Sequence, residues 1–330
     1  MLIERVDPRA DDVRQFFDVY AAAQKVDDPH GPPTSYTDFR GRLIWGDTGD
    51  PMQTWLGWSD DRSRLLGGYT LMLPKYDNPH LGWVEPVVHP EERRRGHGRT
   101  LADHARAQVR ESGRRLLAAG AVEGSPGLAF CDALGAERAS IEHRNVLDLA
   151  DVDEAHIAGL LAEAREAAGG YSVLSWIGEV PKEHLDGVAP LLTAISDAPV
   201  DQLEWQGEAW SPERVRAVEK SLTDTRARRY TIVARHDASG VLAGLTQLYV
   251  SEEHYGWAGQ GHTAVLPEHR GHRLGLLMKA AMLPWLREQE PDVRRVVTTN
   301  AESNSYMLRV NHLLGYRLLD RWFSCQLEVG

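Results

Sequence analysis

The pattern of apolar and polar residues predicts strands that alternate with helices along the whole chain. Residues 66–70 and 242–246 lie in alternating apolar runs that are typical of strands. Leu101, Ala105 and Val109 recur on one face of an amphipathic helix. This succession of elements indicates an α/β or mixed α+β protein.

The same landmarks occur twice in the same order. The two strand patterns just named match at an offset of 176 residues, and 88–98 matches 265–275 at an offset of 177. Residues 134–136 match 314–316 at an offset of 180. Three landmarks at nearly constant spacing indicate that the chain holds two copies of one fold.

Each copy is predicted to contain a strand, one or two helices, three strands, a glycine-containing loop, a helix, a strand, a helix and a final hairpin. In the second copy the last four of these elements are expected at 271–288, 293–298, 303–314 and 316–327. Pro284 lies inside the first of these segments, so that helix is expected to kink or restart there.

A boundary between the copies is predicted near residue 150. The strand-like segment 141–149 is followed by Asp151-Val152-Asp153, which offers a helix N-cap, and Gly169-Gly170 ends the Ala- and Glu-rich helix that follows. The strand pattern 171–177 then opens the second copy. The predicted parts are an N-terminal domain at 1–150, a linker helix at 151–170 and a C-terminal domain at 171–330.

Composition narrows the classes of partner. The chain has 330 residues and a net charge of −11, which argues against nucleic acid as the main ligand and favours a cationic one. No run approaches the ~18 apolar residues of a membrane span, and the acidic start, MLIERVDPRADDV, does not resemble a secretory signal. Cys131 and Cys325 have no metal-ligand spacing. We expect a cytoplasmic protein without a metal or membrane partner, as a monomer or homodimer.

A loop rich in arginine and glycine is the strongest chemical signal. A strand that turns through glycines into a helix presents unpaired backbone N–H groups at the positive end of the helix dipole, where phosphate binds. A P-loop requires Gly-Lys-Ser/Thr after the glycines, and a dinucleotide fingerprint requires a third glycine, which Leu101 replaces. The loop also occurs late in its domain, so neither of these motifs fits.

The first loop, Arg93-Arg94-Arg95-Gly96-His97-Gly98, resembles the coenzyme A diphosphate loop of the GNAT N-acetyltransferase superfamily. The second loop, Arg270-Gly271-His272-Arg273-Leu274-Gly275, resembles it with Arg273 in place of the first glycine. That arginine either grips phosphate or blocks close approach of the ligand. The resemblance implies that these loops hold acetyl-CoA together with Val88 and Val265, the latter polarising the thioester carbonyl through nearby N–H groups.

The segment from Asn304 to Tyr316 resembles the later helix of the same family, in which an Asn contacts the cofactor. Asn311 stands where many members have the tyrosine that protonates the leaving thiolate. In the first copy, Gly124 stands in place of the Asn and Cys131 in place of the tyrosine. The tandem arrangement is similar to mycothiol synthases and related two-domain acetyltransferases. It implies two GNAT-like domains, each a twisted, mostly antiparallel sheet flanked by helices and splayed at the coenzyme, with the first copy degenerate and the second catalytic.

Acetyl transfer to an amine requires the amine to lose a proton, and a positioned base contributes about 10²–10⁴-fold. Glu85 and His262 occupy one aligned position, three residues before Val88 and Val265, and are candidates for this role. A polar residue on the solvent side of a strand is an equal alternative. Tyr306 is a candidate acid, although an aromatic ring packed under a helix is the favoured interpretation of this residue.

The acceptor is expected to be the primary amine of a small molecule, such as an antibiotic, amino sugar, peptide or thiol precursor. An acidic stretch that contains a tryptophan lies in the region that lines the acceptor side in the resembling family, and charge and cation–π contact would attract an ammonium group there. Its candidate residues are Asp197, Asp201, Glu204 and Trp205. For most of these residues, a solvated acidic loop is the favoured interpretation. The alternative functions are a non-catalytic acetyl-CoA-binding sensor or scaffold, and a nucleotide-binding protein.

Overall fold

The computed structural model describes residues 1–46 and 49–330, and these form two compact units. The first unit comprises Met1–Glu142, Val200–Trp205 and Asp320–Gly330, and the second comprises His143–Pro199 and Gln206–Leu319. Neither unit is one continuous stretch of sequence, whereas the domains predicted at 1–150 and 171–330 follow the sequence repeat. The repeat boundaries therefore stay a prediction about the two copies, and the two compact units are described separately below.

The first unit has the predicted order of a strand, two helices and three strands, followed by the loop, a helix, a strand and a helix. Its elements are β1 (Leu2–Val6), α1 (Asp12–Asp27), α2 (Tyr36–Trp45), β2 (Gln53–Trp58), β3 (Leu65–Met72), β4 (Leu81–Val88), α3 (His97–Glu111), β5 (Leu116–Val122), α4 (Pro126–Leu134) and β6 (Glu137–Asp148), the last of which ends in the second unit.

The second unit repeats this order after helix α5 (Glu154–Ala167), whose N-cap is Asp153, as predicted. Its elements are β7 (Tyr171–Ile177), α6 (Leu185–Thr193), the 3₁₀ turn η4 (Ala194–Asp197), α7 (Pro212–Thr225), β8 (Arg228–His236), β9 (Leu242–Val250), β10 (Trp257–Val265), α8 (Leu274–Gln289), β11 (Arg295–Ala301), α9 (Ser305–Leu313) and β12 (Arg317–Glu328), the last of which ends in the first unit.

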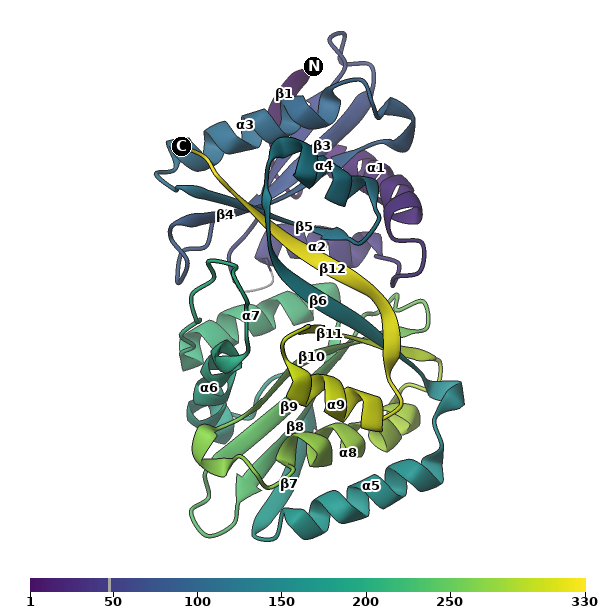
Figure 1. Ribbon diagram of the computed structural model, residues 1–330, viewed down its shortest axis with the longest axis vertical. Coiled ribbons are helices and arrows are strands. Elements are labelled where there is room, and N and C mark those ends of the chain that lie inside the picture. The colour runs from purple at the N-terminus through teal and green to yellow at the C-terminus, as the bar shows by residue number, and fades with distance from the viewer. Residues whose placement is uncertain (47–48) are drawn as a thin grey trace. The chain divides into compact units, whose positions relative to one another are not determined.

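Each unit contains a mostly antiparallel sheet with helices on both faces (Figure 1). In the first unit Leu101, Ala105 and Val109 of α3 are fully buried against one face of the sheet, and Phe16 of α1 and Phe39 of α2 belong to the core on the other face. In the second unit α5 and α8 belong to one apolar core, and α6 and α7 to another. Helices on both faces explain why the central strands are buried over nearly their whole length.

The last strand of each copy does not form the predicted hairpin. β6 and β12 are single strands of 12 residues, and neither contains a glycine or proline that would favour a tight turn. The end of β12 pairs antiparallel with β5 of the first unit, from Trp322 opposite Val122 to Glu328 opposite Leu116 (Figure 1). The first unit is therefore completed by the last strand of the second copy.

The restart expected at Pro284 does not occur, because α8 runs as one helix from Leu274 to Gln289. Leu283 and Leu286, on either side of the proline, are buried at 3% and 0% exposure. Packing of this apolar face offsets the backbone hydrogen bond that the proline removes.

Candidate functional site

In each unit the sheet opens between two parallel strands. Among the strand pairs whose register is described, each unit has one parallel pair. β4 pairs with β5 over Leu81–Trp83 alone, and β10 pairs with β11 over Trp257–Gly259 alone. Past these short ladders a cleft lies beside each arginine-glycine loop, with a volume of about 380 Å³ in the first unit and about 480 Å³ in the second. Both sheets are thus splayed, as predicted from the family resemblance.

The two loops have the same backbone conformation with different residues. The first loop has positive φ at Arg94 (63°) and Gly96 (89°), and the second has positive φ at Gly271 (89°) and Arg273 (53°). The first of these two positions is therefore an arginine in the first loop and a glycine in the second, and the other position is the reverse. A Cβ atom at Gly96 would meet no atom within 4 Å, which explains why an arginine fits at the equivalent position in the second loop.

Both loops present a row of free backbone donors. Within the described residues, none of the N–H groups of 94–99 or 271–276 donates a hydrogen bond to a protein acceptor. The first regular bonds of the two helices come from Thr100 to the Gly96 carbonyl and from Leu277 to the Arg273 carbonyl. Because these donors lie at the positive ends of α3 and α8, each loop has the chemistry of an anion site.

Most of the arginine side chains expected to grip phosphate are held by carboxylates instead. Arg93 binds Asp27 with both of its terminal nitrogens at 2.6 and 2.7 Å, and Arg270 binds Asp197 at 2.5 Å. Arg95 binds Glu92 at 2.7 Å. Arg94 is the exception: its guanidinium makes no ion pair within the described residues, and it lines the first cleft.

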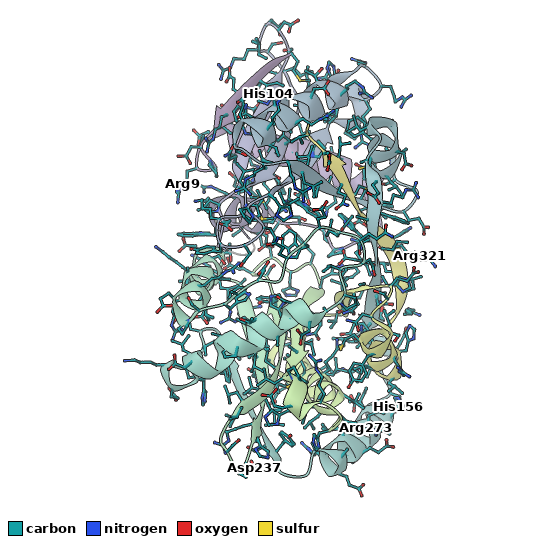
Figure 2. All side chains as sticks on the ribbon, turned by 60° about the vertical axis from the view of Figure 1, so that its left-hand side comes forward. Arg9, His104, His156, Asp237, Arg273 and Arg321 are labelled. Carbon is teal, nitrogen blue, oxygen red and sulfur yellow. The ribbon has the colours of Figure 1, made fainter. Side chains whose placement is uncertain are left out.

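The guanidinium of Arg273 points to α5, where it binds Glu163 at 3.1 Å. Figure 2 shows Arg273 beside the region of α5 that carries His156. Arg273 therefore neither blocks the loop nor, in this state, offers its charge to the cleft. Of the neighbouring residues, His272 has its ring 5.2 Å from the ring of Tyr171, and Leu274 is buried.

Helix α9 forms one wall of the second cleft. The side-chain oxygen of Asn304 caps this helix by accepting a hydrogen bond from the Met307 N–H at 3.2 Å, which leaves its amide nitrogen available to a ligand. Tyr306 is 54% exposed, and its hydroxyl oxygen lies 4.0 Å from the place of a Cβ atom on Gly275. The Tyr306 hydroxyl therefore lies near the start of α8, and the exposed ring is not packed under a helix.

The residues that replace the family tyrosine are both buried. Asn311 is fully buried and donates to the side-chain oxygen of Asn300 at 2.8 Å, while its own side-chain oxygen has no partner within the described residues. Cys131 lies in one small apolar cluster with Cys325, 194 residues later in the chain. A hydrogen bond with Cys325 and burial raise the pKa of Cys131, so its thiol stays protonated. Neither residue supplies an acid of ordinary strength.

Glu85 is engaged in a bidentate ion pair. Arg42 of α2 donates to both of its oxygens at 2.8 and 2.7 Å, and Thr70 donates at 3.4 Å. Burial raises the pKa of Glu85, but the charge and hydrogen bonds of Arg42 outweigh it, so the pKa lies below its ordinary value. Glu85 is therefore ionised and paired, a poor arrangement for accepting a proton.

His262 occupies the equivalent strand position in the second unit, in a different environment. β10 has an irregular register against β9 between Gln260 and Thr263, so His262 lies on a bulge that β4 lacks. Its ring lies 6.5 Å from that of Trp210. Burial, and then the charge of Arg229, lower the pKa of His262 to about 4. The imidazole is therefore neutral at physiological pH.

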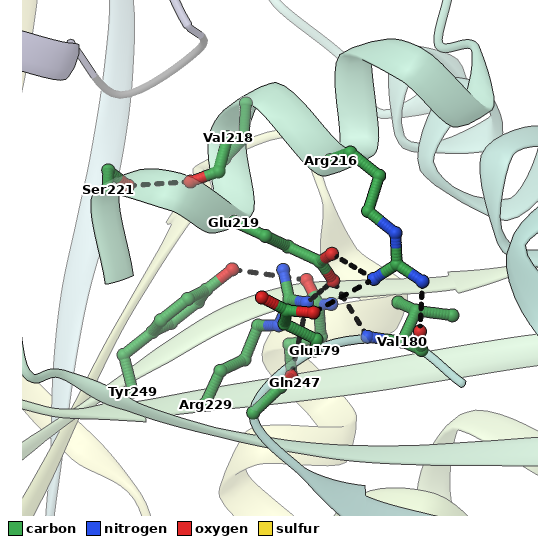
Figure 3. Close-up of polar contacts among 10 residues, drawn as sticks. Glu179, Val180, Arg216, Val218, Glu219, Ser221, Arg229, Gln247 and Tyr249 are labelled. Carbon is green, nitrogen blue, oxygen red and sulfur yellow. Dashed lines mark hydrogen bonds and ion pairs between the residues drawn. The ribbon is translucent and has the colours of Figure 1, made fainter. Parts of the chain in front are cut away.

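Arg229, whose charge helps to lower the pKa of His262, belongs to a buried charge network (Figure 3). Arg229 of β8 forms an ion pair with Glu219 of α7, and both side chains are at most 3% exposed. Arg216 binds the same carboxylate at 2.5 Å, and the Val180 N–H donates to it at 2.8 Å. The sequence analysis did not identify this network. The available signal was the pair of adjacent arginines at the start of the strand RRYTIVARH.

The four residues expected on the acceptor side do not lie in one unit. Asp197 belongs to the second unit, where it binds Arg270. Asp201, Glu204 and Trp205 belong to the first unit, in contact with Ser140, with Arg115 and with Trp83 respectively. Of these four residues, Asp197 lines the cleft beside the second loop. The acceptor subsite stays a prediction.

Two further properties follow from the described residues. No helix among them is both long and apolar enough to cross a membrane. Within the same residues no three His, Cys, Asp or Glu side chains lie together in a way that could hold a metal ion.

Comparison with known proteins agrees with this geometry. The family model described as "Acetyltransferase (GNAT) family" matches residues 13–135 and 194–316, one match in each copy. No curated protein sequence matches the chain. Among solved structures, a tandem GNAT protein from the clavulanic acid biosynthesis pathway is 32% identical, with a TM-score of 0.82 over 100% of this chain and 98% of that one.

Two more distant structures share the fold. A GCN5-related N-acetyltransferase from Sphaerobacter thermophilus has 16% identity and a TM-score of 0.70, over 99% of this chain and 95% of that one. The glucosamine N-acetyltransferase region of a fungal multi-domain β-N-acetylglucosaminidase has 16% identity and a TM-score of 0.67, over 99% of this chain and 38% of that one. The chain belongs to the GNAT family of N-acetyltransferases, as a tandem member with two copies of the fold.

Proposed function

We propose that the protein transfers the acetyl group of acetyl-CoA to the primary amine of a small molecule, and that the second copy is the catalytic one. The observation that carries this proposal is the row of free N–H groups at 271–276, which opens into a cleft of about 480 Å³ beside the splayed end of β10. Free N–H groups at the start of a helix are the donors that bind a diphosphate.

The residues that line the cleft of the second unit suit the coenzyme in their chemistry. Gly275 presents no side chain to the cleft, and the free amide nitrogen of Asn304 faces the same space from the α9 side. Acetyl-CoA would supply the activated thioester. The N–H groups near Val265 would then stabilise the oxyanion that develops on the thioester carbonyl.

His262 is the proposed base of the second copy. A neutral imidazole with a pKa of about 4 is ready to accept a proton but is a weak base, so it assists best when the acceptor amine is only moderately basic. An α-amine with a pKa near 8 costs about 1.4 kcal/mol to deprotonate at pH 7, against about 4.6 kcal/mol for a lysine-like amine. We therefore favour an acceptor amine of low basicity.

One observation favours a different function for the first copy. The residue equivalent to His262 is Glu85, whose charge is neutralised by Arg42, and the residue in the tyrosine position is the protonated thiol of Cys131. The first cleft nevertheless keeps its loop donors and the free guanidinium of Arg94. We infer that the first copy binds acetyl-CoA without turning it over, as a sensor or scaffold.

Steady-state release of coenzyme A from acetyl-CoA, measured with a panel of amines, tests the proposal. Turnover that depends on an amine and is lost in a Gly275→Trp variant, but kept in Gly98→Trp, is the expected result. Binding of acetyl-CoA without turnover for any amine in the panel would leave only the binding function. Protection from thermal unfolding by ATP or NAD, but not by coenzyme A, would favour a nucleotide-binding protein instead.

A further inference from the structure

The first arginine of each loop is held by the same two contacts, one to a strand carbonyl and one to an aspartate, which we call the clasp. The Nε of Arg93 donates to the Val88 carbonyl at 3.2 Å, and the Nε of Arg270 donates to the Val265 carbonyl at 3.1 Å. The terminal nitrogens of each guanidinium bind an aspartate that is the last residue of an earlier helical segment, which is α1 in the first unit and η4 in the second. The clasp is therefore part of the repeat, although the sequence spacing to the aspartate differs.

The two clasps differ in strength. Asp27 receives two hydrogen bonds from Arg93, and the two side chains are 33% and 21% exposed. Asp197 receives one from Arg270, and these side chains are 50% and 51% exposed. A half-exposed, single-bonded pair contributes little stability, whereas a bidentate pair of lower exposure is harder to open.

Asp197 also lies where its charge is unfavourable for the proposed ligand. It lines the same cleft as the free donors at 271–276, so a bound diphosphate would bring a second negative charge next to this carboxylate. Asp197 and the phosphates would both compete for the guanidinium of Arg270. Because hydrogen bonds from Arg to phosphate are stronger than those of an exposed ion pair, the exchange favours phosphate.

We propose that the pair of Arg270 and Asp197 is an exchangeable latch that couples coenzyme binding to acceptor binding in the second unit. This inference rests on the proposed function of that unit. In the free protein Asp197 occupies the guanidinium. Coenzyme binding moves the guanidinium to the diphosphate and frees the carboxylate on the η4 turn. The freed carboxylate then binds the ammonium form of the incoming amine, so the coenzyme binds before the acceptor.

The latch explains why Asp197 is both a plausible acceptor residue by its chemistry and unavailable in the free protein. It also assigns a different role to the first unit, in which the bidentate pair stays closed as a fixed support of the loop. Each unit thus has its own Arg–Asp pair of the same kind. The solvent exposure and the number of hydrogen bonds of the pair decide whether the pair separates.

The experiment compares Asp197→Asn with Asp27→Asn, its matched control. Each variant and the wild-type chain are titrated with coenzyme A by calorimetry, and each titration is repeated on a Gly98→Trp background to remove the first-unit site. For Asp197→Asn we expect coenzyme affinity of the second unit to rise about two- to fivefold, because a competing charge is lost. The KM for the amine should rise at least fivefold, with kcat at saturating amine within about twofold.

The controls separate the latch from a structural role. Asp197→Glu keeps the charge and should restore the wild-type coenzyme affinity, whereas Asp27→Asn should weaken first-unit binding. A lower or unchanged coenzyme affinity in Asp197→Asn would overturn the latch, since a mere support of the loop can only be loosened by its loss. Absence of coenzyme binding by the wild-type chain would instead overturn the proposed function, so the two failures are distinguishable.

Discussion

Arg42 of α2 donates hydrogen bonds to both carboxylate oxygens of Glu85 on β4, at 2.8 and 2.7 Å. This pair separates the first unit from the second, in which the equivalent strand position is the neutral imidazole of His262. Two copies of one fold thus carry a charge-neutralised carboxylate and a free base at the same place.

The first prediction concerns Glu85. Glu85→Gln should leave kcat/KM for amine acetylation within about twofold of wild type, because a carboxylate held by Arg42 does not act as the base. Arg42→Met should instead lower the free energy of unfolding by about 1–3 kcal/mol, since it leaves Glu85 partly buried without its main partner. Steady-state kinetics and urea denaturation measure the two effects. A tenfold loss of kcat/KM in Glu85→Gln would place this residue, and the first unit, in the reaction.

The second prediction concerns His262. His262→Ala should lower kcat/KM at least tenfold, as expected for a lost base. The pKa of His262 is about 4, so the wild-type pH profile should show no loss of activity from this group between pH 5 and 8. Kinetics at constant ionic strength check both statements. An acidic limb near pH 6.5 that disappears in His262→Ala would show that the pKa in the working enzyme is close to that of a free histidine.

The pKa of His262 also has a consequence for stability. The unfolded chain takes up this proton at about pH 6.5, and the folded chain only near pH 4. The unfolded state therefore binds more protons in this window, and the contribution of His262 to stability falls as pH decreases from 6.5 to 4. In His262→Gln, which cannot titrate, this part of the pH dependence of the unfolding free energy should be absent.

The third prediction concerns Lys279, a fully buried lysine on α8 whose ammonium nitrogen lies 5.3 Å from the ring centre of Tyr316. Burial lowers its pKa to about 7. Since the unfolded side chain keeps its proton up to about pH 10.4, the contribution of this group to stability rises with pH from 7 to 10.4. Lys279→Met should stabilise the chain by about 1–4 kcal/mol at pH 7 and by much less at pH 10. Chemical denaturation of both proteins at the two pH values tests this, and an equal effect at both would contradict it.

The fold could be predicted from the sequence to a large extent, because its signals are local. Repeated strand patterns and the loop motif at 93–98 and 270–275 indicated two copies, and the family resemblance carried by the loops implied the splayed sheets. The partners of the loop arginines could not be predicted, since Asp27 and Asp197 lie 66 and 73 residues before them. A strand pattern likewise does not identify its neighbour, so the pairing of β12 with β5 was not foreseen.

The fourth prediction uses the matched glycines Gly98 and Gly275, which stand second in helices α3 and α8. A Cβ atom on Gly98 would approach the Phe130 ring at 3.5 Å, which is ordinary contact, so the free protein tolerates it. Gly→Ala in a helix stabilises by roughly 0.4–1 kcal/mol, and we expect this for both variants. Coenzyme affinity should nevertheless fall, because each methyl group points into a cleft. A gain in stability together with a loss of affinity, by calorimetry, separates ligand contact from misfolding.

The fifth prediction tests the pairing of β12 with β5 through Gly120 of β5. A Cβ atom there would lie 2.2 Å from the indole nitrogen of Trp322 on β12, which is well inside any permitted contact. Gly120→Val should therefore lower the free energy of unfolding by about 1–3 kcal/mol, as overpacking does. In the double variant, Trp322→Ala should relieve most of the loss of unfolding free energy that Gly120→Val causes. With substitutions at distant sites, the effect of Trp322→Ala on the unfolding free energy should be additive. This coupling, measured as a double-mutant cycle by urea denaturation, requires β12 to lie on β5 in solution. Additive effects of the two substitutions would mean that the last strand of the second copy pairs elsewhere.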